Sequence, residues 1–182
     1  MENDKDLYKS FLDGDSESFE KIVLKYKDSI IYFISRYTKD IDIAEDISQD
    51  VFVYILLNKE KYDFNYSLKT YLYIIAKSRA INYIKKESKV VSFNEIEKFC
   101  SEDEELEEKI FKDNKAKQLR KHIKELKPDY QAIIYLLDIE EYGYSEAAEI
   151  MNKSVIQIKT LAHNAREKLK KVCRKESAVY EG

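Results

Sequence analysis

The polar side chains best suited to chemistry lie in two separate stretches. Asp42 to Val53 carries carboxylates and an amide among apolar residues, whereas Val155 to Val172 carries cations, amides and hydroxyls. Carboxylates on a helix face invite either water or a basic partner, and cations with amides can contact phosphates and base edges. Each stretch is therefore a candidate binding surface, with an ordinary solvated helix face as the alternative.

No pattern of residues in the sequence predicts catalysis or metal binding. His122 and His163 have no carboxylate or cysteine partner at ligand spacing, and Cys100 and Cys173 are far apart without a CxxC motif. We expect no metal, no cofactor, reduced thiols and a surface position for His122. The acidic start, M-E-N-D-K-D, and the absence of an apolar run of about 20 residues predict a cytoplasmic protein without membrane insertion.

The composition favours an all-α protein. Only three Gly and one Pro occur among 182 residues, and 44% hydrophobic residues suffice for one domain or two small ones. Helices are expected at Lys5–Leu12, Ser16–Tyr37 and Asp42–Leu57, followed by a loop, N-K-E-K-Y-D-F-N-Y, and a further helix capped by Ser67.

The helix expected at Asp42–Leu57 is apolar on one face and acidic on the other. Its apolar stripe is predicted to enter a core through Ile43, Ile47, Val51 and Tyr54. The face left outside carries Asp42, Glu45, Asp46, Gln49 and Asp50. Most such faces are simply solvated, and the local sequence does not distinguish that from docking.

Charge is divided unevenly along the chain. The formal net charge is −3, yet residues 109–182 hold 16 Lys/Arg against 11 Asp/Glu, and residues 92–108 hold one against eight. The acidic segment predicts a linker, and the basic C-terminal part is compatible with nucleic-acid binding.

The C-terminal part has the pattern of a helix-turn-helix. Helices are predicted from Asp113 to before Pro128, at Asp129–Ile139, at Tyr144–Met151 and at Val155–Val172, with N-K-S as a tight connection. The apolar stripe of the last helix is predicted to be Val155, Ile158, Ala162, Ala165, Leu169 and Val172. The end of a plain helical bundle would show similar periodicity.

Three segments together resemble the bacterial sigma-70 family, in particular its extracytoplasmic-function (ECF) group. They are D-I-A-E-D-I-S-Q-D-V-F at 42–52, Y-D-F-N-Y-S-L-K-T-Y-L-Y-I-I-A-K-S-R-A-I-N-Y-I-K-K at 62–86, and the helix-turn-helix from Tyr144. The resemblance implies that the first segment binds core RNA polymerase through Asp42, Glu45, Asp46, Gln49 and Asp50. It implies that the other two read the minus-ten and minus-thirty-five promoter elements, and many family members also have an anti-sigma factor as partner.

The resemblance assigns DNA contacts to residues in two groups. Minus-ten contacts are expected from Tyr62, Phe64, Tyr66, Lys77, Ser78, Arg79, Asn82, Lys85 and Lys86. Minus-thirty-five contacts are expected from Ser154, Ile156, Gln157, Lys159, Thr160, His163 and Arg166. Independently, aromatic rings offer stacking surfaces for unpaired bases and nearby cations attract the backbone, although about half of the aromatic residues should be structural.

The expected architecture is two small helical domains joined by an acidic linker. Residues 1–87 would form the region 2-like domain, 88–112 the linker, and 113–182 the region 4-like helix-turn-helix domain. The expected function is that of a sigma factor, which catalyses no reaction itself. The alternatives are a helix-turn-helix regulator that binds an operator without polymerase, and a helical interaction protein that has lost DNA binding.

Overall fold

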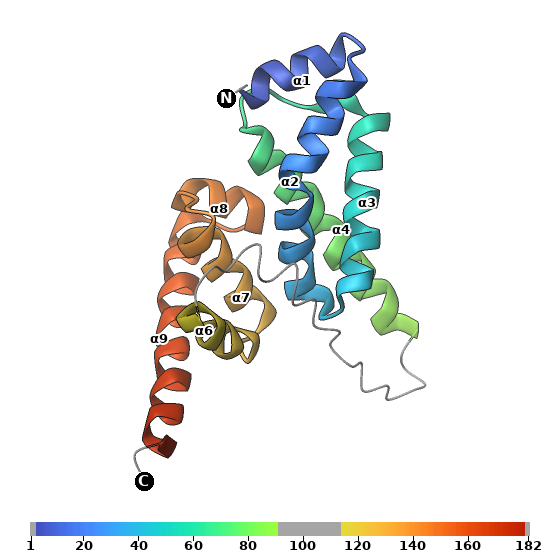
Figure 1. The fold of residues 1–182 in the computed structure, drawn as a ribbon. Helices are drawn as coiled ribbons and strands as arrows, with labels where there is room; N and C mark the ends of the chain where they lie inside the picture. The colour runs from blue at the N-terminus through green and yellow to red at the C-terminus, as the bar shows by residue number, and fades with distance from the viewer. Residues whose placement is uncertain (1–2, 91–113, 181–182) are drawn as a thin grey trace. The chain divides into compact units, whose positions relative to one another are not determined.

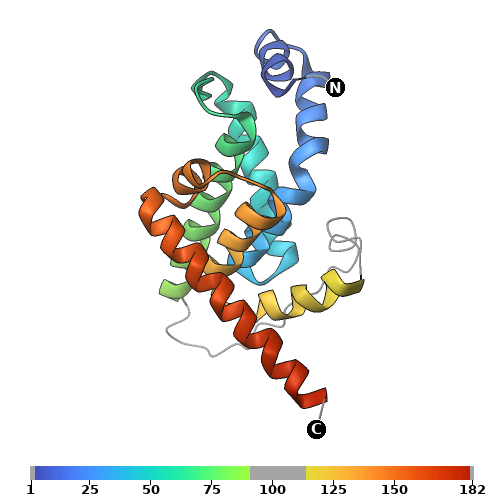
Figure 2. The same cartoon turned by 90° about the vertical axis from the view of Figure 1, so that its left-hand side faces the viewer.

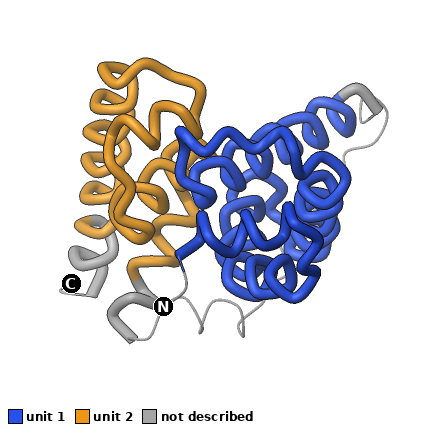
Figure 3. The backbone as a smooth tube through the Cα atoms, turned by 90° about the horizontal axis from the view of Figure 1, so that it is seen from above, with its two compact units in different colours: residues 1–103 blue, residues 104–182 orange. Residues whose placement is uncertain are grey.

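The chain is described by a computed structural model, in which residues 3–90 and 114–180 are defined. Within those two ranges every regular element is a helix, in agreement with the predicted all-α class. The chain divides into two compact units, residues 1–103 and 104–182 (Figure 3). Most of the predicted linker, from residue 91, lies outside the described residues, and residues 88–90 belong to the last helix of unit 1.

The described part of unit 1, residues 3–90, contains four α-helices and one short 3-10 turn. They are α1 (Asp4–Leu12), α2 (Ser16–Thr38), α3 (Ile41–Leu57), η1 (Lys59–Lys61) and α4 (Leu68–Val90). Helices α2, α3 and α4 pack on one another, and α1 packs on α2 (Figures 1 and 2). The core between them is formed by fully buried side chains, which include Ile22, Ile30, Phe33, Ile34, Val51, Ile55, Leu72, Tyr73 and Ala76.

Side-chain caps define where the helices of unit 1 begin. Asp15 accepts a hydrogen bond from the amide of Glu17 at 3.0 Å, after Gly14 has turned the chain with a positive φ of 103°. Asp40 accepts from the amides of Asp42 and Ile43 at the start of α3. Ser67 accepts from the amide of Thr70 at 3.0 Å, which confirms its predicted role at the start of α4.

The buried face of α3 is wider than the predicted stripe. Ile47 and Val51 are buried as predicted, whereas Ile43 and Tyr54 are only half-buried. The buried set is Ala44, Ile47, Ser48, Val51, Phe52 and Ile55. Because α3 packs against both α2 and α4, it needs an apolar face broader than a single row of side chains.

Unit 2 is built around its last helix. Its elements are α6 (Asn114–Lys124), α7 (Pro128–Ile134), the π-helical turn η3 (Tyr135–Ile139), α8 (Tyr144–Met151) and α9 (Val155–Tyr180). Helices α6, α7 and α8 all pack against α9. The predicted break at Pro128 is confirmed, and α9 continues eight residues beyond the predicted end at Val172.

Three predicted positions in unit 2 were wrong. His122, expected at the surface, is buried, because α6 packs within unit 2 and buries Arg120 and Ile123 as well. Leu119, which the apolar spacing of the predicted helix places inside with Ala116, Ile123 and Leu126, is 44% exposed and lines a pocket with side chains of α9. Val155, the first residue of the predicted α9 stripe, is 37% exposed at the first position of the helix.

Candidate polymerase and nucleic-acid interfaces

The predicted acidic face of α3 is fully at the surface. Asp42, Glu45, Asp46, Gln49 and Asp50 are all exposed. The four carboxylates lie in the first ten residues of α3, and those in its first turns are favoured by the positive end of the helix dipole. Asp50 also lies 3.9 Å from the guanidinium of Arg79 on α4. This face presents negative charge without disturbing the core beneath it.

A groove of about 370 Å³ lies beside this acidic face, between α2 and α3. Its lining residues are Val23, Lys27, Ile31, Glu45, Ser48, Gln49, Phe52 and Val53. The hydroxyl of Ser48 is buried there with no hydrogen-bond partner, and Val53 is 51% exposed. Sequence reasoning missed the groove because it depends on how α2 packs on α3; the only local signal was the exposed apolar Val53.

The loop between α3 and α4 holds its aromatic residues in different environments. Tyr62 is buried, with its ring centroid 4.7 Å from that of Phe64 and 5.1 Å from that of Tyr71. Its hydroxyl donates to the carbonyl oxygen of Tyr66 at 2.8 Å, and burial raises the pKa of Tyr62 to about 12. Tyr66 is 41% exposed. Among the three predicted loop aromatics, Tyr66 offers the most accessible ring and Tyr62 braces the loop from inside.

The predicted minus-ten residues of α4 also divide into two groups. Ser78, Asn82, Lys85 and Lys86 are exposed, whereas Lys77 and Arg79 are half-buried. The guanidinium of Arg79 lies 5.1 Å from the ring centroid of Tyr54, and the ammonium of Lys61 lies 5.8 Å from the same ring. Arg79 is therefore held against α3 by a cation–π contact in addition to its pairing with Asp50.

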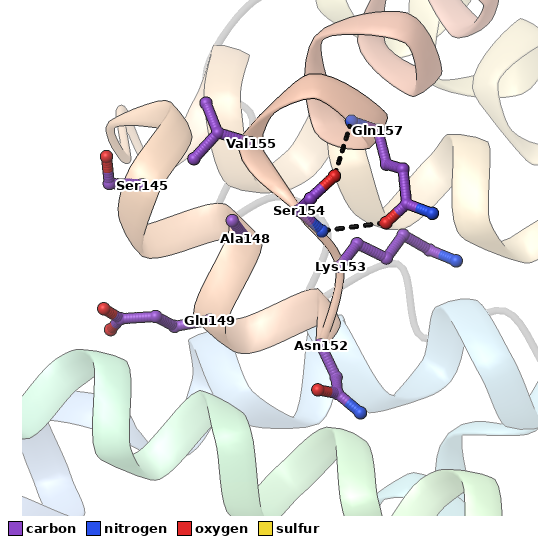
Figure 4. A pocket seen from close by; sticks show the side chains of 8 residues that line it. All are labelled: Ser145, Ala148, Glu149, Asn152, Lys153, Ser154, Val155 and Gln157. Atoms are coloured by element: carbon purple, nitrogen blue, oxygen red, sulfur yellow. Dashed lines mark hydrogen bonds between the residues drawn. The ribbon is translucent and has the colours of Figure 1, made fainter.

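Helices α8 and α9 form a helix-turn-helix with a well-capped turn. Asn152 ends α8 in the left-handed conformation, with φ of 50°. The Ser154 hydroxyl accepts from the amide of Gln157 at 3.2 Å, and the Gln157 side chain accepts from the amide of Ser154 at 2.8 Å (Figure 4). These two predicted DNA contacts thus form a reciprocal capping box that fixes the start of α9.

Most of the predicted contact residues of α9 are accessible. Ile156 is 78% exposed, and Lys159, Thr160 and His163 are also exposed. The Thr160 hydroxyl donates to the carbonyl oxygen of Ile156 at 3.1 Å. A shallow hollow of about 570 Å³ adjoins the start of the helix, lined by Ser145, Ala148, Glu149, Asn152, Lys153, Ser154, Val155 and Gln157 (Figure 4).

Arg166 differs from the other predicted contacts because it is engaged within unit 2. Its guanidinium donates to both carboxylate oxygens of Asp138, at 2.6 and 3.2 Å, and lies 3.4 Å from the Tyr144 hydroxyl. These hydrogen bonds, chiefly that to Asp138, raise the pKa of Arg166 above its already high ordinary value. Lys159 lies over the same Tyr144 ring, 5.9 Å from its centroid.

The described part of the chain holds neither a metal-binding cluster nor a membrane-spanning helix. Residues 3–90 and 114–180 contain no cluster of three or more His, Cys, Asp or Glu side chains able to hold a metal ion. No helix in those ranges combines the length and apolarity required to cross a bilayer. Cys173 is half-buried, and Cys100 lies outside the described residues.

Comparison with known proteins assigns the chain to a family. The family model of sigma-70 region 2 matches residues 22–90, and that of sigma-70 region 4 matches residues 116–169. The chain is 30% identical over 159 residues to RNA polymerase sigma factor YlaC of Bacillus subtilis, covering 85% of this chain and 91% of that protein. It is also 30% identical over 172 residues to the ECF RNA polymerase sigma factor SigW of the same organism, covering 88% and 91%. The chain therefore belongs to the sigma-70 family, in its extracytoplasmic-function group.

Two solved structures share the fold at lower sequence identity. The sigma factor RpoE, crystallised with the anti-sigma factor NepR from Bartonella quintana, is 19% identical with a TM-score of 0.69, covering 87% of this chain and 98% of that one. CnrH, solved in complex with the cytosolic domain of CnrY, is 16% identical with a TM-score of 0.67, covering 94% and 97%. Both likenesses agree with the predicted all-α fold.

Proposed function

We propose that this chain is a sigma factor that binds core RNA polymerase and directs it to specific promoters, where it recognises and helps to melt the minus-ten region. The observation that carries the proposal is the presence of both sigma-70 regions, in family order, on one chain. The polymerase performs the RNA synthesis, so the chain itself is not an enzyme. It acts in the cytoplasm, where core polymerase and promoter DNA are found.

Residues 1–87 act as the polymerase-binding and minus-ten domain in this proposal. The acidic face of α3 contacts polymerase through Asp42, Glu45, Asp46, Gln49 and Asp50, whose exposure leaves them available without unfolding. Contacts between an acidic surface and a basic partner favour rapid and specific association. The linker, residues 88–112, connects this domain to the helix-turn-helix domain, residues 113–182.

Minus-ten recognition is assigned to the loop of residues 58–67, hereafter the minus-ten loop, and to the outer face of α4. The exposed ring of Tyr66 is the main stacking surface, and Phe64 of the same loop is half-buried. The DNA backbone is attracted by Lys77, Lys85 and Lys86, with Ser78, Arg79 and Asn82 between them along α4. Tyr62 supports the loop from below.

Minus-thirty-five recognition is assigned to the first three turns of α9. Ile156, Lys159, Thr160 and His163 are exposed there and can enter a major groove. Ser154 and Gln157 place the helix start, where backbone amides favour a phosphate. Arg166 reaches DNA only by leaving or sharing its contact with Asp138.

An anti-sigma factor is a further proposed partner. The support is that two proteins with the same fold were solved with such partners or with a cytosolic partner domain, RpoE with NepR and CnrH with CnrY. A protein that covers the α2–α3 groove and the acidic face would compete directly with polymerase.

Reconstituted transcription with purified core polymerase tests the proposal. Run-off transcripts should start at defined sites only when the chain is added, and mapped start sites should share upstream elements. Binding to a palindromic operator by the chain alone, with no effect on core polymerase, would instead support the stand-alone regulator. Lys159→Glu with Arg166→Glu should abolish promoter selection; unchanged output would remove the DNA-reading role of α9.

A further inference from the structure

Helix α1 contacts the minus-ten loop, although it lies before the residues that match the family model. That match begins at residue 22, whereas α1 ends at Leu12. The family model therefore assigns no role to α1. Its contacts with the loop join segments about 50 residues apart in the chain, so they must be formed by tertiary structure.

Hydrogen bonds run in both directions between α1 and the loop. The Tyr8 hydroxyl donates to the backbone carbonyl oxygen of Lys59 at 2.9 Å. The Lys59 ammonium donates back to the carbonyl oxygen of Leu12 at 2.9 Å and lies 3.5 Å from that of Phe11. A cation is favoured at the last turn of a helix, where carbonyl groups lack intrahelical partners. Tyr8 and Lys59 thus form a reciprocal clasp between helix and loop.

A continuous row of aromatic rings supports the clasp. Tyr8 is completely buried, with its ring centroid 4.5 Å from that of Tyr62 and 6.0 Å from that of Phe64. Phe11 lies 5.5 Å from Tyr8 and stacks on Phe19 of α2 at 4.6 Å. The rings therefore connect α2, through α1, to the inner side of the minus-ten loop.

The outer side of the loop is left open by this arrangement. Tyr62 donates its hydroxyl to the carbonyl oxygen of Tyr66, which fixes the backbone of the exposed residue. Asp63 accepts from the amide of Asn65 at 2.9 Å and closes a local turn. The backbone is held from within, while the ring of Tyr66 remains accessible.

We propose that Tyr8 and Lys59 are positioning residues for the minus-ten loop, and that α1 holds this loop in its DNA-binding shape before DNA arrives. The proposal rests on the assignment of the loop to minus-ten recognition. Neither residue contacts DNA; both reduce the conformational freedom that the loop would otherwise lose on capturing an unpaired strand.

The test compares holoenzymes that contain the wild-type chain, Tyr8→Phe or Lys59→Met. Tyr8→Phe removes one hydroxyl and keeps the ring, and Lys59→Met removes the charge and keeps an apolar stem. The probes are a fork-junction DNA with a single-stranded minus-ten strand and no minus-thirty-five element, and a duplex with the minus-thirty-five element alone, taken from a mapped promoter. Each variant should bind the fork about threefold to tenfold more weakly, the range expected for one lost hydrogen bond.

Three controls separate positioning from general destabilisation. Binding of the duplex probe and of core polymerase should stay unchanged in both variants. Lys59→Arg, which keeps a cation near the end of α1, should restore fork binding. Tyr135→Phe removes a tyrosine hydroxyl that bonds to Glu140 in unit 2, and it should leave fork binding unaffected.

Amide exchange at Lys61 and Tyr66, whose amides are both hydrogen-bonded within the loop, should accelerate only in the clasp variants.

Two results would overturn the proposal. Unchanged fork affinity in both clasp variants would show that the loop does not need α1. A parallel fall in core affinity and fork affinity would show that the clasp only stabilises unit 1. Failure of the proposed function is distinguishable from both, because the wild-type holoenzyme itself would then fail to bind the fork.

Discussion

Asp138→Asn separates two possible roles for Arg166, as a phosphate contact and as a tie that holds α9 in place. The Arg166 guanidinium makes two hydrogen bonds to the Asp138 carboxylate, and both side chains are 40% exposed. An ion pair at this exposure is worth up to about 1 kcal/mol after solvent screening. If Arg166 must leave Asp138 to contact DNA, neutralising Asp138 should strengthen minus-thirty-five binding by up to about fivefold.

The same substitution should weaken folding while it strengthens DNA binding. The free energy of unfolding of unit 2 should fall by up to about 1 kcal/mol in denaturant titrations. Fluorescence anisotropy with a minus-thirty-five duplex, repeated over a salt series, measures the affinity. Arg166→Gln should lower both quantities and reduce the salt slope by about one released counterion. The double variant, Asp138→Asn with Arg166→Gln, should be no less stable than either single variant, because the second substitution removes no further part of the same ion pair.

Asp129→Asn is the matched control for the loss of one negative charge. Asp129 pairs with Lys153 at 3.8 Å, so it has the same chemistry in the same unit without contacting Arg166. An equal gain in affinity from Asp129→Asn would show that the gain from Asp138→Asn arises from net charge alone. If Asp138→Asn weakens DNA binding as much as Arg166→Gln does, Arg166 acts by holding α9, and its assignment as a phosphate contact is wrong.

Three further predictions concern unit 1. Asp46→Lys combined with Asp50→Lys should lower affinity for core polymerase at least about tenfold. Helical circular dichroism should stay unchanged, since both side chains are exposed. Glu20→Lys on α2 is the control, and retained polymerase affinity in the double variant would contradict the polymerase assignment. Tyr66→Ala should weaken capture of a single-stranded minus-ten element by about 1 to 3 kcal/mol, whereas Tyr66→Phe should keep it; equal losses would argue against stacking. Burial raises the pKa of Tyr62 from 10.0 to about 12, so its neutral form stabilises unit 1 below pH 10 and this contribution is lost as pH rises towards 12. Tyrosinate absorbance from Tyr62 should therefore appear together with alkaline unfolding, and its appearance near pH 10 in the folded chain would contradict this burial.

Helix positions were predictable because their signals are local. Asp15, Ser67 and Pro128 mark helix starts through hydrogen bonds or a fixed φ that involve only neighbouring residues. The apolar period of α2 likewise specifies which side of it is buried. The exact buried faces were less predictable. Helix α3 packs against two helices, and His122 of α6 is buried by tertiary packing, which is not visible in a local window of sequence.

The candidate sites were predictable in the types of residue but less so in their environment. Exposure of the acidic face follows from periodicity alone. The burial of Tyr62 does not, because its ring is covered by Tyr8, which is 54 positions earlier in the chain. The pairing of Arg166 with Asp138 similarly joins α9 to η3 over 28 positions. Long-range contacts decided which aromatic and cationic side chains remain available to a partner.

The ion pair of Asp50 with Arg79 provides only a weak coupling between polymerase binding and minus-ten recognition within unit 1. It joins a proposed polymerase contact to a proposed DNA contact, so docking at Asp50 would release Arg79 from one of its two partners. The carboxylate is 70% exposed and the separation is 3.9 Å, which makes the pair worth less than about 1 kcal/mol. Coupling through it is therefore below about fivefold. Tethering offers a larger gain in promoter affinity, because two weak DNA contacts held on one polymerase act at a high effective concentration.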